Sequence, residues 1–256
     1  MPSRKAVQGI GSVEIAGRLL VALADAMRPM NLSKVAAAAK MPASKARRYL
    51  VSLCRAQLVH QNSDTGQYGV GSLVLRLAFA TPARQELMPV ALPVMKRLRD
   101  ELNETVSLVI WIERGPLVLH YEESDHPVRL NTVTGSIMPI ITSASGQVFG
   151  AFSKEEEVAE AAKNELKQLI KSGKSRYLSW DDVERMFNEI ADRGIARAVG
   201  TVLPGISGLG CPIRRKCGSL AGALVVTGHK GSMDSRLNGT VASALMAAAK
   251  EISRSL

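Results

Sequence analysis

The chain has 256 residues, a formal net charge of +10 and three cysteines. This length suits one or two domains that bury a core without disulfides or a structural metal. The odd cysteine count, without a CxxC pair, argues against a secreted disulfide scaffold and favours the reducing cytoplasm. We expect neither a membrane-spanning helix nor a signal peptide, because no uncharged apolar run of about 20 residues is present and the N-terminus is polar.

The positive charge is concentrated in the first third of the chain. Residues 1–80 hold 11 Lys and Arg against 3 Asp and Glu, a balance of +8, whereas residues 81–256 carry +2. A local field of this sign favours a polyanionic partner. The alternative is a basic surface that only aids solubility.

The first 80 residues predict three short helices followed by a hairpin. Apolar residues at helical spacing mark helices at about 12–27, 32–39 and 43–55, and Asn31 is an N-cap candidate for the second. Two extended runs around the polar tip 62–66 predict a β-hairpin. This order is that of a winged helix-turn-helix, in which the second helix of the motif enters the major groove of DNA.

The helix expected at 43–55 combines an apolar stripe with a basic face. Arginine on such a face pairs bidentately with guanine, and lysine and serine reach phosphates. A solvated surface helix is the alternative. With one residue before the helix and one in the wing, the expected contacts to double-stranded DNA are Ser33, Ser44, Lys45, Arg47, Arg48, Ser52, Arg55 and Gln67.

The remainder of the chain mixes strands with helices and predicts an α+β class, because no strict βαβ alternation is present. Thr81-Pro82 is a candidate boundary, although a connecting helix through Pro89 and Pro93 is the alternative. Ser153 to Glu156 has the form of a capping box, Ser179 is an N-cap and Gly194 a C-cap. Strands are expected at 106–112, 117–121, 206–213 and 220–227, and helices at 143–152, from 153, at 180–192 and at 234–253.

Motifs spread along nearly the whole chain match those of one family. In the first third the specific ones are the stretch 41–50 and the D-x-G-x-Y-x-x-G pattern from Asp64 to Gly71. Later ones are Gly135 with Pro139, the run 143–147, the run 193–196 and the run 204–213. Together they resemble the IclR family of bacterial transcription regulators.

The resemblance implies an N-terminal winged helix-turn-helix domain with a linker helix at 1–80. It implies a GAF-like effector-binding and oligomerisation domain with a central antiparallel sheet at 81–256. A palindromic operator, a homodimer or dimer of dimers, a cytoplasmic location, no cofactor and no catalysis are implied as well. Two departures stand out: Lys40 occupies the place of the usual glycine of the motif turn, and Thr201 that of a common glutamate.

A small-molecule pocket needs an apolar wall and a few convergent polar groups. N–H groups at the start of the helix near Ser145 and Gly146 suit a carboxylate. The resemblance adds that small or apolar residues replace polar ones at three positions, so we expect a small organic acid with an apolar body, such as an aromatic acid. Plain sheet core is the alternative for the apolar members. The expected pocket residues are Trp111, Leu119, Ser143, Ala144, Ser145, Gly146, Ala198, Gly208, Leu209, Cys211, Val225 and Thr227.

Motifs for catalysis and metal binding fail on spacing. The run 173–175 lacks the first glycine of a phosphate loop, and the four histidines have no metal-ligand spacing. His120 and Glu122 share a strand face, and a solvated strand explains them better than an acid–base pair. A small-molecule enzyme with a basic N-terminal accessory remains the main alternative function, and a non-specific nucleic-acid binder is another.

Overall fold

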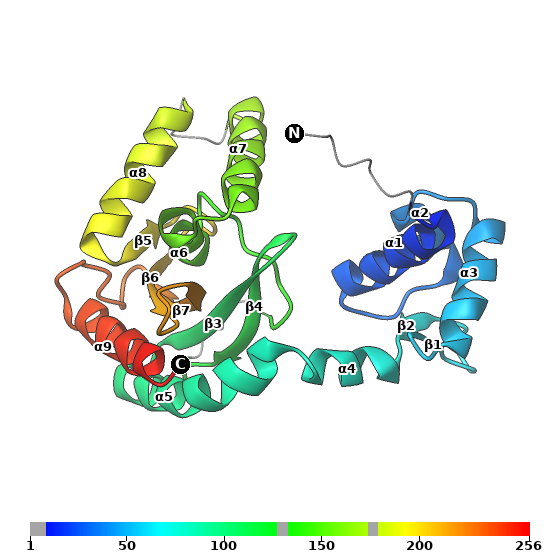
Figure 1. The fold of residues 1–256 in the computed structure, drawn as a ribbon, viewed down its shortest axis with the longest axis horizontal. Helices are drawn as coiled ribbons and strands as arrows, with labels where there is room; N and C mark the ends of the chain where they lie inside the picture. The colour runs from blue at the N-terminus through cyan, green and yellow to red at the C-terminus, as the bar shows by residue number, and fades with distance from the viewer. Residues whose placement is uncertain (1–8, 127–132, 174–178) are drawn as a thin grey trace. The chain divides into compact units, whose positions relative to one another are not determined.

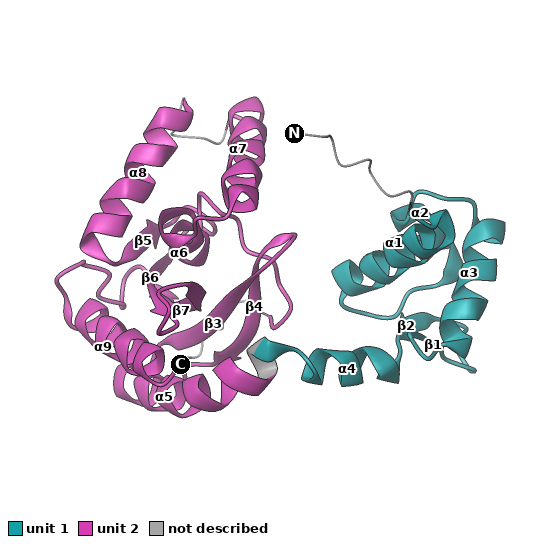
Figure 2. Cartoon of the chain, viewed as in Figure 1, with its two compact units in different colours: residues 1–84 teal, residues 85–256 magenta. Residues whose placement is uncertain are grey.

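The computed structural model describes residues 9–126, 133–173 and 179–256. It divides into two compact units, unit 1 at residues 1–84 and unit 2 at residues 85–256 (Figures 1 and 2). Unit 1 is helical with one small hairpin, and unit 2 is a sheet with helices on both faces. The expected α+β class is confirmed.

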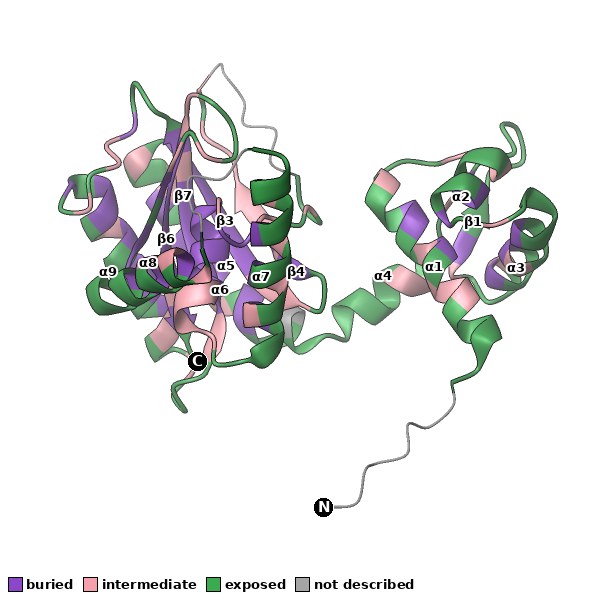
Figure 3. Ribbon diagram, turned by 90° about the horizontal axis from the view of Figure 1, so that it is seen from above, coloured by how far each residue is buried: buried purple, intermediate pink, exposed green. Residues whose placement is uncertain are grey.

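Unit 1 is a helix-turn-helix with a wing. It contains α1 (Gly11–Ala26), α2 (Leu32–Ala38), α3 (Ala43–Arg55), the antiparallel strands β1 (Val59–Gln61) and β2 (Tyr68–Val70), and α4 (Ser72–Phe79). Its core joins all three motif helices to the hairpin and includes Leu19, Leu23, Val35, Ala46, Leu50, Leu53, Val59 and Tyr68. The outer faces of α2 and α3 are exposed, as Figure 3 shows.

The turn between α2 and α3 has an unusual backbone. The expected N-cap of α2 is confirmed, because Asn31 Oδ1 accepts a 3.0 Å hydrogen bond from the Lys34 N–H. At the other end of α2, Lys40 adopts φ = 53°. This left-handed conformation favours glycine and costs an L-residue about 1–2 kcal/mol. The turn is therefore formed with Lys40 under local strain.

Unit 2 is built on one antiparallel sheet in the order β4-β3-β7-β6-β5. The strands are β3 (Thr105–Ile112), β4 (Gly115–Glu122), β5 (Ala196–Val199), β6 (Ile206–Arg214) and β7 (Leu220–His229). The short π-helical segment η1 (Ala83–Leu87) leads into α5 (Met88–Leu102), which continues through Pro93. The other helices are α6 (Ala144–Phe152), α7 (Glu156–Lys171), α8 (Trp180–Arg193) and α9 (Thr240–Arg254).

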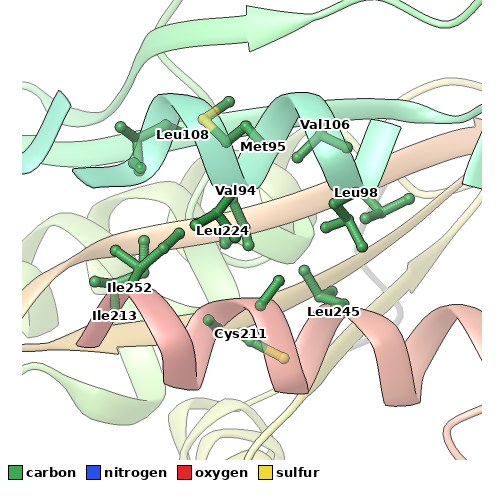
Figure 4. Packing of buried hydrophobic residues seen from close by; sticks show 14 of the residues in the cluster. Val94, Met95, Leu98, Val106, Leu108, Cys211, Ile213, Leu224, Leu245 and Ile252 are labelled. Atoms are coloured by element: carbon green, nitrogen blue, oxygen red, sulfur yellow. The ribbon is translucent and has the colours of Figure 1, made fainter. Parts of the chain in front are cut away.

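The two faces of the sheet bury different sets of side chains. Helices α5 and α9 cover one face, where Leu108, Leu209 and Leu224 pack with α9 residues such as Leu245 (Figure 4). Helix α6 covers the other face, where it meets Val109, Ala198 and Val225. Successive strand residues alternate between these faces. A residue's parity along its strand therefore decides whether it faces α6 or α9.

Three local expectations for unit 2 need correction. No capping box forms at Ser153: α7 follows Glu155, which makes no side-chain cap bond, and Ser153 Oγ accepts from the Glu155 N–H at 3.2 Å. The last helix starts at Thr240, because the turn before it is shaped by the Asp234–Arg236 ion pair. Strand β5 was not expected, since it has only four residues. The cap residues Ser179 and Gly194 are confirmed.

Candidate functional site

Helix α3 presents a polar face to solvent and an apolar face to the core. Ala46, Leu50 and Leu53 are at most 5% exposed and anchor the helix. All six expected α3 contact residues are exposed: Ser44, Lys45, Arg47, Arg48, Ser52 and Arg55. Among the described residues, none of the α3 cations pairs with a carboxylate. Their charges are therefore available to an anionic partner.

The outer face of α3 carries a shallow hollow of about 600 Å³. It brings together Ser44, Lys45, Arg48 and Ser52, and it adds Tyr49. Tyr49 was not among the expected contact residues. A tyrosine has an apolar ring and a polar hydroxyl, so it can pack against the core and also reach the polar face of the helix. This amphipathic character is the sequence signal that could have identified it.

Four of the expected DNA contacts do not line this hollow: Arg47 and Arg55 on α3, Ser33 on α2 and Gln67 in the wing. Ser33 belongs to the start of α2, where its hydroxyl donates to Asn31 Oδ1 at 3.0 Å. Gln67 is exposed at the wing, where its carbonyl oxygen accepts from the Asn62 N–H at 2.8 Å. The wing tip is held by the Asn62 side chain, which accepts from the Asp64 and Thr65 N–H groups. The tip is thus a rigid polar turn rather than a cationic arm.

Unit 2 contains a cavity of about 380 Å³ on the α6 face of the sheet. The start of α6 forms one side, and strands β5, β6 and β7 form the floor. The loop between β5 and β6 supplies Val202 and Leu203. Seven expected pocket residues line the cavity: Ser143, Ala144, Ser145, Ala198, Gly208, Val225 and Thr227.

Five expected pocket residues do not line the cavity. Leu209 and Cys211 lie on β6 with the opposite parity to Gly208 and pack in the core beneath α5 and α9, where Figure 4 shows Cys211. Leu119 packs against the same core. Trp111 packs against Phe149, with ring centroids 5.6 Å apart. The sequence shows that alternate strand residues face opposite sides of the sheet, but it does not show which side contains the cavity.

Gly146, the last of the five, is a packing residue rather than an open N–H donor. A Cβ at this position would collide with the carbonyl of Pro139 and with Ile140. Its N–H donates to Ser143 Oγ at 2.9 Å, so the N-cap consumes the donor that we expected to meet a ligand. Close approach of two backbones explains the glycine.

The described residues that line the cavity include no ionisable side chain. Two hydroxyl protons are already committed: Ser143 donates to the Pro139 carbonyl at 2.5 Å and Thr201 to the Thr142 carbonyl at 2.6 Å. Thr227 Oγ1 is buried without a partner among the described residues. The wall residues Met138, Val202, Leu203 and Ile206 are apolar and were missed, because they come from loops or a strand end without regular patterning. The chemistry suits a ligand with an apolar body and few polar atoms.

Two family models match the two units in the same order as the architecture. Residues 12–63 match the IclR helix-turn-helix domain, and residues 79–254 match the C-terminal domain of the bacterial transcriptional regulator IclR. The chain belongs to the IclR family of bacterial transcription regulators. Members of the IclR family bind DNA and a small-molecule effector and are not enzymes, so the enzyme alternative is set aside.

Individual relatives of known name or structure extend over nearly the whole chain. The glycerol operon regulatory protein of Streptomyces coelicolor is 25% identical over 251 residues, which is 97% of each chain. HmgR of Pseudomonas aeruginosa is 31% identical, with a TM-score of 0.61 and coverage of 96% of this chain and 97% of that chain. An IclR homologue from Microbacterium hydrocarbonoxydans, solved with 4-hydroxybenzoate, has a TM-score of 0.78 at 20% identity, with coverage of 96% and 98%. The last comparison supports the fold.

The described part of the chain offers no metal centre and no membrane-spanning helix. Among the described residues, no group of three or more His, Cys, Asp and Glu side chains converges on a metal position. No described helix has the length and apolar content needed to cross a membrane. His120 and Glu122 form a 2.9 Å pair on β4, away from the cavity lining.

Proposed function

We propose that this IclR-family chain reads a palindromic double-stranded operator with α3 and senses a small organic acid, such as an aromatic acid, in the cavity of unit 2. Unit 1 is then the DNA-binding domain, and unit 2 the effector-binding and oligomerisation domain. The observation that carries the proposal is the exposed cationic face of α3, which pairs with no carboxylate of the described residues and is backed by a buried stripe. A helix of this kind fits the major groove, which is about 12 Å wide.

The DNA contacts divide by chemistry. Arg47 and Arg48 are exposed and follow the buried Ala46 by one and two residues, so both extend from the face of α3 that points away from the core. Arginine reads guanine bidentately, whereas Lys45 and the serines suit phosphate oxygens. We therefore assign base reading to the two arginines and backbone contacts to Ser33, Ser44, Lys45, Ser52, Arg55 and Gln67.

The effector proposal rests on the cavity's size and lining. A volume of about 380 Å³ lies within the roughly 300–1,000 Å³ range of small-molecule pockets. The start of α6 supplies the positive end of a helix dipole, which favours a carboxylate. The apolar wall of Met138, Val202 and Leu203 suits a hydrocarbon or aromatic body. A relative's complex with 4-hydroxybenzoate makes that acid a suitable first probe.

The oligomer proposal follows from operator symmetry. A palindrome presents two equal half-sites, and two copies of one reading helix occupy them, so we propose a homodimer or dimer of dimers. Helix α4 supports this, because Leu75, Leu77 and Phe79 are 58%, 55% and 53% exposed. Exposed apolar side chains gathered on one short helix are typical of a protein interface. A second copy of this chain is the proposed partner.

A binding selection tests the DNA half of the proposal. Full-length protein is used to select duplexes from a random library, and the affinity of the enriched sequence is compared with that of a shuffled duplex. We expect an inverted repeat to be enriched, with an affinity that falls about 10³–10⁵-fold between 50 and 200 mM salt if about 6–10 phosphates are neutralised. Equal affinity for selected and shuffled duplexes would instead support non-specific nucleic-acid binding.

A thermal-shift panel tests the effector half. The panel contains benzoate, 4-hydroxybenzoate, phenylacetate, pyruvate and glycerol. We expect an aromatic acid to raise the melting temperature of unit 2 most, since a ligand at 100 times its Kd stabilises by about 2.7 kcal/mol. A shift produced only by pyruvate or glycerol would contradict the apolar-acid assignment.

A further inference from the structure

The segment from Pro139 to Thr142 enters α6 and is held by side chains instead of a backbone ladder. The Ile140 and Ile141 N–H groups donate to the two Glu165 carboxylate oxygens, at 2.5 and 3.1 Å. The Ile141 carbonyl accepts from Gln147 Nε2 at 3.0 Å. The Pro139 and Thr142 carbonyls accept from the hydroxyls of Ser143 and Thr201, respectively. The conformation of this segment is therefore set by four side chains.

Glu165 is the contribution of α7 to this set. Glu165 is partly buried in the middle of the helix, and its two carboxylate oxygens accept hydrogen bonds from consecutive backbone N–H groups. Burial raises the pKa of Glu165, against the opposing effect of hydrogen bonds from the Ile140, Ile141 and Thr142 amides. A buried N–H group that loses its acceptor costs free energy, so the position of the carboxylate fixes the positions of these three N–H groups.

The held segment decides which hydroxyl atoms reach the cavity. The Ser143 proton is committed to the Pro139 carbonyl, and Ser143 Oγ accepts from the Gly146 N–H at 2.9 Å. Ser143 Oγ also lies 3.1 Å from Ser145 Oγ, so Ser145 is the donor of that pair. Ser145 lines the cavity, and no other hydrogen bond to its Oγ is found among the described residues. This proton arrangement persists only while Pro139 and Ile140 stay in place.

We propose that Glu165 is a positioning residue for the cavity: its carboxylate holds the 140–142 backbone and thereby sets Ser143, Ser145 and the first turn of α6 in the arrangement that receives a ligand. This inference rests on the proposed function of the cavity as the effector site. Glu165 itself is outside the cavity lining and acts through the segment that it holds. Helix α7 is thus a determinant of effector affinity.

The test replaces Glu165 by Gln, which keeps the size but turns one accepting oxygen into an amide donor that faces an N–H group. Glu160→Gln is the matched control, because Glu160 is exposed on the same helix. Hydrogen exchange of the 140–143 amides and the Kd for the tightest acid of the panel, beginning with 4-hydroxybenzoate, are measured on the full chain. We expect E165Q to speed exchange at these amides and to raise the Kd of the acid about tenfold or more, with exchange in β6 and β7 unchanged. E160Q should match the wild type in both exchange and Kd.

Two results would overturn the inference. One is unchanged exchange at 140–143 in E165Q, and the other is faster exchange with an unchanged Kd. If E165Q does not fold, Glu165→Asp serves, because it keeps the charge and shortens the reach; it is expected to give intermediate exchange and affinity, and wild-type values for both would contradict the proposal. A wild-type protein that binds no acid of the panel would defeat the effector proposal and this inference together. Binding by the wild type with an unchanged Kd in E165Q would defeat this inference only.

Discussion

The Thr201 hydroxyl donates a 2.6 Å hydrogen bond to the carbonyl oxygen of Thr142, 59 residues earlier in the chain. Thr201 lies in the loop whose Val202 and Leu203 form part of the cavity wall, and Thr142 precedes the N-cap of α6. The bond therefore ties the two sides of the cavity together. Because its proton is committed, Thr201 offers a ligand no donor.

Replacing Thr201 by Val removes this bond while keeping the side-chain shape. The Thr142 carbonyl then loses its donor, at a cost of about 1 kcal/mol, and we expect the Kd for 4-hydroxybenzoate to rise roughly fivefold. Thr201→Ser keeps the hydroxyl and is the control, with a Kd near that of the wild type. Titration calorimetry checks both. Equal Kd values for T201V and T201S would show that the bond does not support the site.

Arg48 is expected to be a base-reading residue. Arg48→Ala should weaken binding to the selected operator by about 1–3 kcal/mol, the range of one bidentate base contact. Arg185→Ala is the control, because Arg185 is an exposed arginine on α8 of unit 2. Fluorescence anisotropy with a labelled duplex measures the affinity. If R48A binds like R185A, Arg48 has no part in reading the operator.

Lys40 is expected to destabilise its turn through its backbone. Lys40 has φ = 53°, so Lys40→Gly relieves the strain of this left-handed conformation. Glycine also raises the entropy of the unfolded chain, which offsets part of this effect, and we expect a net gain of about 0.5–1 kcal/mol in the free energy of unfolding. Ala38→Gly, at an exposed helical position two residues earlier, should instead lose about 1 kcal/mol. Urea unfolding followed by circular dichroism compares the two. A K40G chain no more stable than the wild type would refute the strain argument.

Asp234 is expected to make stability depend on acid pH. Bidentate hydrogen bonds from Arg236, at 2.8 and 3.0 Å, lower the pKa of Asp234 from 3.8 to about 2. A lowered folded-state pKa stabilises the fold above pH 3.8, and this stabilisation is lost as the pH falls through 2. Asp234→Asn should therefore melt below the wild type at neutral pH, with a difference that shrinks on acidification. A difference that is constant between pH 7 and pH 2 would contradict this, and the exposed Asp192→Asn is the control.

The DNA-reading unit was largely predictable because its signals are local. Helix spacing, the Asn31 cap and the polar wing tip each depend on residues within a few positions of one another. The buried stripe of Ala46, Leu50 and Leu53 and the exposed arginines are two consequences of the same helical period. Tyr49 is half-buried and both packs against the core and lines the hollow, a double role that helical period alone does not show.

The cavity was only half predictable because it joins segments far apart in sequence. Strand β6 is buried on both faces, so its pattern distinguishes neither the parity of Gly208 nor that of Leu209. The contact between Glu165 and the 140–142 backbone has no local signature, since a glutamate in mid-helix is ordinarily a surface residue.

The order of residues along the chain determined the two kinds of unit, most helix limits and the cationic face of α3, because these follow from periodicity and capping over short distances. Tertiary structure decided which sheet face contains the cavity and which protons are free within it. Those properties depend on how α6, α7 and the β5–β6 loop meet, and hydrogen-bond commitments exist only once such distant groups are in contact.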